Sequence, residues 1–334
     1  MARKRKSARI LVTGASGFLG AHLCAQLSQS GAKLRSLGRR AHDHLEQYGV
    51  EQVVGSVISP EDCAKAMDGI DQVYHLAGMV SRDPSDSGLM YDVHVRGTRN
   101  ILAACQDAKI HKIVVVSTSG TVGVGTSADF MAQEDSPTPW SLIGRWPYYE
   151  SKAFAEREIQ RFVDGGLPVR IARPTLLLGP GDLNGSSTGD VVRFLSGQVT
   201  AALPGGLSFV DVRDVADCLP RLMEDGEPGV GYLMGAINLG VRDFLLGLEQ
   251  VSGVNAPAFT IPHSVVSRAG GWLKKVSRLP MFGGLDEETF EMGCHYWYIA
   301  THRACDELGF DPRDWNETLR DTVDDIRSIG MRKR

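Results

Sequence analysis

The sequence predicts an α/β protein in which a doubly wound parallel sheet is followed by a smaller C-terminal lobe. Three observations lead to this fold class. Short runs of β-branched residues alternate with helical patterns through the first 180 residues, as in successive βαβ units. A glycine-rich turn directly follows the first of these runs. Beyond residue 180 the alternation loosens and Gly and Pro become more frequent.

The glycine-rich turn indicates a dinucleotide site. The apolar run 10–12 leads into glycines spaced G-x-x-G-x-x-G and then into the helical pattern 21–27. Glycines let the backbone approach a pyrophosphate, and the N-terminus of the helix offers free N–H groups and a positive dipole end. We therefore expect a Rossmann fold with cofactor contacts from Gly14, Ser16, Gly17, Phe18, Leu19 and Gly20.

Further elements follow in order along the chain. After the first strand we expect strands at 33–37, 52–54, 72–76, 113–117 and 169–172, with helices at 60–68, 92–108 and 150–164. This order predicts a ligand at the carboxyl ends of the strands. The clearest helical regions of the second half are 238–251 and 304–329. The predicted organisation is a flexible basic tail (1–8), a dinucleotide-binding domain (9–180) and a mainly substrate-binding lobe (181–334).

Composition narrows the class of protein. The 334 residues carry a formal net charge of −4, which argues against a nucleic-acid partner. The basic start has no apolar stretch behind it, and no apolar run is long enough to span a bilayer, so we expect no secretory signal and no stable membrane insertion. The six cysteines show no C-x-x-C spacing, which favours buried thiols in the cytoplasm over disulfides or a metal site.

A catalytic pair is indicated by the Y-x-x-x-K spacing of Tyr148 and Lys152. On a helix these residues share one face, so the ammonium lies near the phenol and the cofactor ribose. A nearby lysine and an oxidised nicotinamide both favour the phenolate, which would let Tyr148 exchange a proton with a carbonyl or alcohol oxygen. Tyr149 has no lysine four residues later and is expected to pack or line the pocket.

With these motifs, the chain from Arg9 to about Ile329 resembles the extended short-chain dehydrogenase/reductase superfamily. Within it, the chain is similar to the NAD-dependent epimerase/dehydratase-like proteins, and most to their dihydroflavonol-4-reductase-like branch. The matching motifs are Thr13–Gly20, His75–Ala77, Arg173–Gly181 and Phe209–Ala216. The resemblance implies that 209–220 returns to the cofactor domain, and that the cofactor also contacts Leu76, Ala77, Gly78, Tyr148, Lys152 and Pro174.

The resemblance also implies a hydroxyl residue that completes a triad with Tyr148 and Lys152. Aligning Gly123 with the closing glycine of the family motif assigns this role to Thr118, with Ser119 as the alternative. Two positions depart from the family pattern. His94 replaces the usual Asn and is expected to be a buried supporting residue, and Ser56 replaces the Asp that addresses adenine, leaving that contact to Ser56 and Val57.

Cofactor choice depends on the end of the second strand. Relatives that use NAD carry an acidic residue there, whereas this chain has Gly38 followed by Arg39 and Arg40. An arginine can grip a 2′-phosphate in a bidentate way, so we expect NADP(H) rather than NAD(H).

Residues that are absent from the motifs narrow the class of reaction. Family dehydratases carry an Asp-Glu pair where this chain has Ser119-Gly120, and epimerases usually carry an Asn near the end of strand six. We expect reduction of a carbonyl to an alcohol, or the reverse. A nucleotide-sugar epimerase with bound NAD is the enzyme alternative, and a non-catalytic NADP-binding regulatory protein is the other.

The substrate pocket is expected to be mostly apolar. Met79, Ser119, Thr175 and Leu176 are the predicted substrate contacts, and Met79, Val80, Met131, Trp140 and Trp146 favour a small hydrophobic ketone or alcohol over a sugar nucleotide. Residues 264–279 are interpreted as a lid or packing helix, with a membrane-surface role as the alternative. The sequence leaves open whether the protein forms a homodimer.

Overall fold

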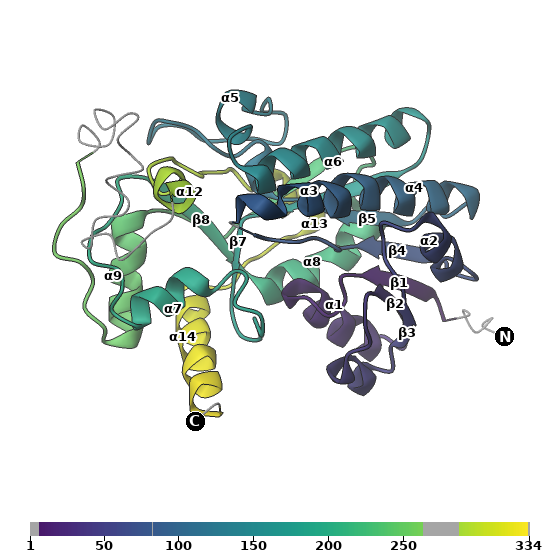
Figure 1. The fold of residues 1–334 in the computed structure, drawn as a ribbon, viewed down its shortest axis with the longest axis horizontal. Coiled ribbons are helices and arrows are strands. Elements are labelled where there is room, and N and C mark those ends of the chain that lie inside the picture. Colours follow the sequence, from purple (N-terminus) through teal and green to yellow (C-terminus); the bar gives the residue numbers. More distant parts are fainter. Residues whose placement is uncertain (1–6, 82, 263–286, 333–334) are drawn as a thin grey trace.

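The computed structural model describes residues 7–81, 83–262 and 287–332. Its centre is a sheet of seven strands in the order β3-β2-β1-β4-β5-β6-β9, in which every pairing is parallel (Figure 1). The order reverses between β1 and β4, which creates a crevice at the carboxyl ends of these strands. The doubly wound fold is confirmed. The strands are β1 (Arg9–Thr13), β2 (Lys33–Gly38), β3 (Glu51–Val54), β4 (Gln72–His75), β5 (Ile113–Val116), β6 (Val169–Pro174) and β9 (Gly231–Met234).

Helices cover both faces of this sheet. On one face, side chains of α1 (Phe18–Gln29), α8 (Val212–Asp225) and α13 (His302–Leu308) share a buried apolar cluster with strand residues such as Val12 and Val114. On the other face, α2 (Pro60–Ala66), α4 (Gly97–Asp107) and α6 (Pro147–Asp164) pack against Leu11, Val73 and Val115. Strands buried on both faces produce the continuous apolar runs seen in the sequence.

The C-terminal lobe is built on a second sheet of three strands. Its strands β7 (Leu176–Leu178), β8 (Gly206–Asp211) and β10 (Ile237–Gly240) lie in the order β10-β8-β7. Helices α7 (Gly189–Leu195), α9 (Val241–Ser252) and α14 (Trp315–Arg332) pack around an apolar cluster that includes Phe194, Phe209 and Phe244. Residues 209–220 were expected to return to the cofactor domain. In the structure, β8 pairs within the small sheet. The helix α8 then packs against the large sheet, and β9 pairs with β6 in that sheet.

Two expected helices have different limits in the structure. Residues 238–240 belong to β10, because the side chain of Asn238 is held by the backbone of Ile299 at 2.9 Å and α9 begins only at Val241. The region 304–329 is divided into α13 and α14, because Gly309 ends α13 in the left-handed conformation with φ of 59°. The remaining short elements are η1 (Asp43–Tyr48), η2 (Pro84–Asp86), α3 (Ser87–Tyr91), a π turn η3 (Asp92–Arg96), η4 (Ser119–Thr121), α5 (Trp140–Ile143) and α12 (Glu287–Met292).

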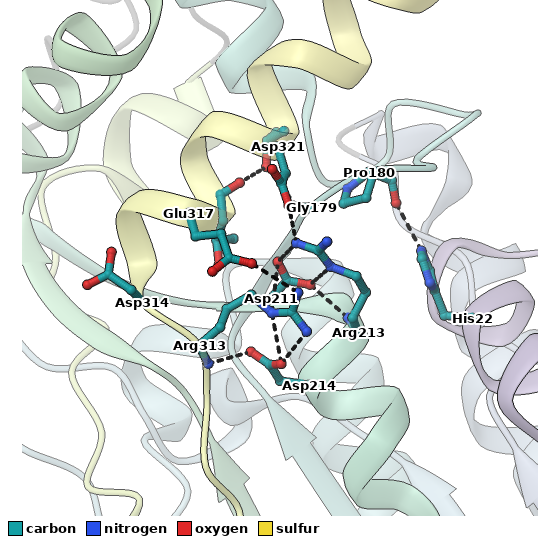
Figure 2. Close-up of polar contacts among 12 residues, drawn as sticks. His22, Gly179, Pro180, Asp211, Arg213, Asp214, Arg313, Asp314, Glu317 and Asp321 are labelled. Atoms are coloured by element: carbon teal, nitrogen blue, oxygen red, sulfur yellow. Dashed lines mark hydrogen bonds and ion pairs between the residues drawn. The ribbon is translucent and has the colours of Figure 1, made fainter.

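A buried ionic cluster joins the lobe to the sheet. Asp211, at the end of β8, has no exposed surface and accepts two hydrogen bonds from the guanidinium of Arg213, which also binds Asp321 of α14 (Figure 2). Two guanidinium nitrogens of Arg313 donate to Oδ1 of Asp214, and the backbone N–H of Arg313 donates to Oδ2 of the same carboxylate. Burial alone would raise the pKa of Asp211, but the hydrogen bonds from Arg213 outweigh it and hold that pKa below its usual range.

The same helix α14 fixes the loop that follows β7. The backbone N–H of Gly179 donates to Oγ1 of Thr322 at 2.7 Å, and the N–H of Gly181 donates to a carboxylate oxygen of Asp325 at 2.8 Å. From the other side, the ring of His22 on α1 bonds to the carbonyl of Pro180 at 2.9 Å (Figure 2). This loop therefore has a defined position between the two sheets.

All six cysteines are free, and five of them are buried, as the sequence predicts. Within the described ranges, no helix has the length and apolarity needed to cross a membrane. Across the same ranges, His, Cys, Asp and Glu side chains form no group of three suited to a metal ion.

Candidate active site

The turn between β1 and α1 is pressed against the end of β4. Gly14 has a φ of 71°, and a Cβ at this position would lie 2.7 Å from backbone atoms of Leu76 and Ala77. The N–H of Gly17 donates to the carbonyl of Gly14 at 3.0 Å, and α1 begins at the next residue. Only glycine fits this turn, which leaves the N-terminus of a twelve-residue helix open to an anionic ligand.

A cavity of about 790 Å³ extends from this turn along the carboxyl ends of the strands. Its shape and its glycine cradle fit a dinucleotide. Most of the predicted cofactor residues line it: Gly14, Ser16, Gly17, Arg39, Arg40, Ser56, Val57, Leu76, Ala77 and Gly78. Phe18, Leu19, Gly20 and Pro174 instead line a second cavity, which is continuous with the first.

Arg39 and Arg40 give the far end of this cavity a positive charge. Both side chains are exposed, and neither forms a hydrogen bond or ion pair within the described chain. Burial and the charge of Arg40 lower the pKa of His42, so this neighbouring imidazole adds no charge at neutral pH. No described residue that lines the cavity is Asp or Glu.

The loop that carries Ser56 and Val57, on one side of the cavity, is organised by Asp62, a residue that the sequence did not single out. Its carboxylate accepts a hydrogen bond from the N–H of Ser56 at 2.8 Å. The hydroxyl of Ser56 accepts from the N–H of Ile58 at 3.3 Å, and Asn100 holds the carbonyl of Val57 at 3.0 Å. The loop that carries Ser56 and Val57 is thus fixed by bonds from α2 and α4.

A second cavity of about 620 Å³ opens from the first toward the C-terminal lobe. Gly14, Gly17, Leu76, Gly78, Met79 and Asn184 line both cavities, so the two meet at the end of β4. The predicted triad residues Thr118, Tyr148 and Lys152 line the second cavity, together with the predicted substrate residues Met79, Ser119, Thr175 and Leu176. The structure therefore brings the predicted catalytic and substrate residues together.

Tyr148 lies in the first turn of α6, which Pro147 begins. Its phenol lies near the hydroxyl of Thr118, the residue that caps η4. Burial of the phenol raises the pKa of Tyr148 to about 12, and the hydroxyl of Thr118 opposes this only in part. The expected preference for phenolate is therefore absent from the protein by itself, because desolvation is the larger effect.

Lys152 lies one helical turn after Tyr148 and is 8% exposed. Its ammonium donates to the carbonyl of Val116, at the end of β5, over 3.1 Å. Burial lowers the pKa of Lys152 to about 8, although the carboxylate of Glu156 acts in the opposite direction. Glu156 is itself held by a bidentate contact from Arg173, with the shorter bond at 2.7 Å. This accounts structurally for the arginine of the R-P segment.

Two buried histidines, His75 and His94, pack beneath the loop that follows β4, where the two cavities meet. His75 bonds to Thr13 at 2.7 Å and to Thr98 at 3.1 Å, and burial lowers its pKa to about 3. His94 is 1% exposed and accepts a hydrogen bond from the N–H of Met79. It is a buried supporting residue, as the sequence predicts.

The apolar wall of the second cavity differs from the one expected. Met79 and Val80 line it, but Met131, Trp140 and Trp146 do not. Trp146 is 1% exposed and packs against Trp297, Trp140 packs against Phe154, and Met131 lies at the surface beside Asn238. Aromatic residues of a loop can face either a core or a pocket, and these face the core. The suggested lid, 264–279, lies outside the described residues.

The C-terminal lobe supplies most of the remaining wall. The lining residues that the sequence did not reveal include Val191, Val199, Leu203, Leu207, Phe244, Leu245, Met292 and Trp297. They come from separate elements with no common motif. Tyr149 lines the same cavity and packs over Gly120, where a Cβ would collide with its ring, so its expected packing role is confirmed.

Comparison with known proteins decides the family. The model of the NAD dependent epimerase/dehydratase family matches residues 10–240. The chain belongs to this family. A Synechocystis relative named "Putative dihydroflavonol 4-reductase" is 30% identical over 334 residues, covering 96% of this chain and 95% of the relative. Sterol demethylase protein B of Methylococcus capsulatus is 31% identical over 258 residues, covering 75% and 77%. The crystal structure of gox2253 is similar with a TM-score of 0.85 and 28% identity, covering 97% and 99%.

As a member of the epimerase/dehydratase family, the chain is an NAD(P)-dependent oxidoreductase of the extended short-chain dehydrogenase/reductase type. The resemblance that the sequence motifs indicate is thereby confirmed.

Proposed function

We propose that this family member is an NADPH-dependent reductase that converts the carbonyl of a small hydrophobic substrate to an alcohol, or catalyses the reverse reaction. The observation that carries this proposal is the junction of the two cavities. Tyr148, Thr118 and Lys152 line the second cavity, whose walls are mostly apolar, and Nζ of Lys152 is 3.6 Å from where a Cβ on Gly78 would lie. Gly78 also lines the cationic cofactor cavity.

The preference for NADPH rests on the charge of the cofactor cavity. A 2′-phosphate is stabilised by an arginine that has no competing carboxylate, and Arg39 and Arg40 meet this condition. The ribose hydroxyls of NAD would instead favour an acidic residue at position 38, where this chain has glycine.

The residues of the junction have distinct tasks in carbonyl reduction. When bound, the nicotinamide supplies the hydride. The pKa of about 12 keeps Tyr148 protonated at neutral pH, so its phenol can donate a proton to the carbonyl oxygen as negative charge develops there. Thr118 donates a second hydrogen bond to the same oxygen. The positive charge of Lys152, one turn along α6, then stabilises the phenolate that remains.

The composition of the second cavity favours a hydrophobic substrate. Apolar side chains such as Leu176, Val199 and Phe244 form the larger part of its wall and offer no partners to a sugar or a diphosphate. Polar side chains, among them Asp190, Gln198 and Thr200, line the rest. Arg193 is the observation that favours the second candidate, a nucleotide-sugar epimerase, since apart from Lys152 it is the one Lys or Arg among the described residues that line this cavity. A single cation is a weak match for a diphosphate.

The two candidates differ in cofactor stoichiometry. We would incubate the purified protein with NADPH and a panel of alkyl, aryl and polycyclic ketones, and separately with nucleotide sugars and NAD. The proposal predicts one alcohol formed for each NADPH oxidised, with larger kcat/KM for more apolar ketones. Isomerisation of a nucleotide sugar without net cofactor oxidation would replace it with the epimerase, and tight NADPH binding with neither activity would favour a regulatory protein.

A further inference from the structure

His94 occupies an unusual place between two parts of the site. It lies in the π turn η3, between α3 and α4, and its ring is buried between the loop after β4 and the first turn of α6. π turns are rare and are often associated with functional sites. The family pattern has Asn here, so this chain has a larger ring with two separated nitrogens at this position.

The partners of the two ring nitrogens determine the tautomer. The N–H of Met79 can only donate, so Nε2 of His94, at 3.0 Å, must accept and carry no proton. The proton of the neutral ring is then on Nδ1, which donates to Oγ of Ser151 at 2.8 Å. The hydroxyl of Ser151 donates in turn to the carbonyl of Tyr148 at 2.9 Å. Three hydrogen bonds thus run in one chain from Met79 to Tyr148, through His94 and Ser151.

The surroundings of His94 keep it neutral. Burial is the largest effect that lowers its pKa well below the ordinary histidine value, followed by the charge of Lys152 on α6 and the neighbouring ring of His75 on β4. The bond from the N–H of Met79 acts in the opposite direction but is the smaller effect. A protonated Nε2 would oppose the N–H of Met79 with a second donor, so the neutral ring is the form that this geometry requires.

The groups joined by His94 define the junction of the cavities. Gly78 and Met79 line both cavities, and a Cβ on Gly78 would lie 3.4 Å from Nε2 of His94 and 3.6 Å from Nζ of Lys152. The ring of His94 also meets the ring of Tyr148 edge to face, with centroids 5.6 Å apart at 81°. One side chain therefore sets the spacing between the cofactor-facing loop and the phenol.

We propose that His94 is a positioning residue that, as its Nδ1–H tautomer, fixes the loop of Gly78 and Met79 against the helix turn that carries Tyr148. Its branch to Met79 orders the loop for cofactor binding. Its branch through Ser151 and its ring contact orient the phenol for proton transfer. The catalytic part of this inference rests on the proposed reductase function, whereas the tautomer and the loop contact do not.

The two branches can be separated by substitution. In His94→Gln, the amide oxygen reaches the position of Nε2 and can still accept from Met79, but the ring and the bond to Ser151 are lost. In His94→Asn, the amide nitrogen occupies the position of Nδ1 and can donate to Ser151, but it does not reach Met79. His94→Leu removes both branches, and Ser151→Ala removes the two bonds of the Ser151 branch, from Nδ1 of His94 and to the Tyr148 carbonyl, while the bond to Met79 and the ring contact remain.

We expect His94→Gln and His94→Asn to affect different quantities, the first mainly kcat and the second mainly the affinity for NADPH. His94→Gln and Ser151→Ala should lower kcat about tenfold or more through misorientation of the phenol, with the NADPH dissociation constant within about twofold of wild type. His94→Asn should weaken NADPH binding about threefold to tenfold, and it should lower kcat less than His94→Gln does, because it keeps the bond to Ser151 and loses only the ring contact with Tyr148. His94→Leu should show both losses. Ile101→Ala, a buried substitution in α4 away from the site, controls for general destabilisation and should lower the unfolding temperature without a change in kcat.

Two measurements do not require turnover. Fluorescence titration with NADPH tests the Met79 branch, and the ¹⁵N chemical shifts of the ring, assigned by the loss of signal in His94→Gln, should show a protonated Nδ1 and an unprotonated Nε2. Three results would overturn the inference: an Nε2–H tautomer or an imidazolium at pH 7, wild-type kcat and NADPH affinity in His94→Leu, or losses of kcat and affinity in all variants that are proportional to the decrease in unfolding temperature. If the tautomer and the binding effects are found but no ketone is reduced, the proposed function fails while the loop contact stands.

Discussion

The hydroxyl of Thr118 lies near the phenol of Tyr148 and lowers the pKa of that phenol, against the larger effect of burial. The neighbouring hydroxyl residue, Ser119, lines the same cavity but is buried in η4 and is not among the groups that shift the pKa of Tyr148. Two adjacent hydroxyls that are equivalent in the sequence are therefore different in the structure. The difference gives the order of their expected importance.

Thr118→Val should lower kcat far more than Ser119→Ala. Valine keeps the shape of threonine and removes only the hydroxyl, so the loss reports the missing hydrogen bond to the carbonyl oxygen. We expect Thr118→Val to lower kcat about tenfold to a hundredfold. The loss of one hydrogen-bond donor to a developing oxyanion typically lowers the rate by a similar or larger factor. Steady-state kinetics with a reducible ketone is the measurement, and the reverse ranking would transfer the role to Ser119.

Tyr148→Phe should abolish nearly all turnover while cofactor binding stays almost intact. Phenylalanine keeps the ring that packs against His94 and Tyr149 and removes only the proton-bearing hydroxyl. General acid–base catalysis typically contributes a hundredfold or more. Single-turnover rates and NADPH titration of the variant check the two parts separately, and near-normal turnover is incompatible with the assignment of Tyr148.

Lys152→Met should weaken cofactor binding and rate but stabilise the protein at neutral pH. Burial lowers the pKa of Lys152 from 10.5 to about 8, so the unfolded chain holds this proton more tightly than the folded one. The resulting destabilisation is fully present below pH 8 and is relieved as the pH rises from 8 to 10.5. Methionine is unbranched and of similar length, so it fills the same space without a charge.

The measurement is the unfolding temperature of both proteins between pH 7 and pH 10. The variant should unfold at the higher temperature at pH 7, and the difference should shrink with rising pH. Lys65→Met, at an exposed position on α2, is the matched control and should show no such trend. A difference that is independent of pH, or a less stable variant at pH 7, would show that burial of the ammonium is not the cause.

Six of the seven strands of the large sheet could be predicted from the sequence, because runs such as those of β1 and β5 are buried and apolar. The seventh strand, β9, was not predicted, although all four of its residues are buried. The glycine turn and the spacing of Tyr148 and Lys152 were equally visible, since each is a local pattern. The strands of the lobe were not, because β7 has three residues and β10 has four, with no buried alternation. Such short segments carry too little periodicity to be distinguished from loops.

The interior of the site depends on contacts between distant residues. Trp146 stands in a loop of the sequence, and only the position of Trp297, 151 residues later, makes it a core residue. The tautomer of His94 depends on a backbone N–H fifteen residues away and a hydroxyl on α6. The protein by itself does not favour the phenolate for a similar reason, because the burial that raises the pKa of Tyr148 is a tertiary effect.

Gly38→Asp should shift the cofactor preference toward NADH. Gly38 does not need to be glycine for space, since the nearest atom to an added Cβ, the carbonyl oxygen of Arg40, is 3.6 Å away. A carboxylate there would repel a 2′-phosphate and accept bonds from ribose hydroxyls. We expect the KM for NADPH to rise about tenfold or more and the KM for NADH to fall. Gly38→Ala separates the effect of the Cβ from that of the charge, and an equal effect of alanine would contradict the electrostatic explanation.

The most direct test of the account is the ratio of kcat/KM for NADPH to that for NADH, measured with one ketone for the wild type and for Arg39→Ala. A charge-assisted bidentate contact with a phosphate contributes about 1.5 to 3 kcal/mol, or roughly tenfold to a hundredfold in preference. The account predicts a wild-type ratio in this range, lowered in Arg39→Ala through a higher KM for NADPH with little change for NADH, and lowered further when Arg40 is also replaced. A wild-type ratio near one that neither substitution changes would contradict it.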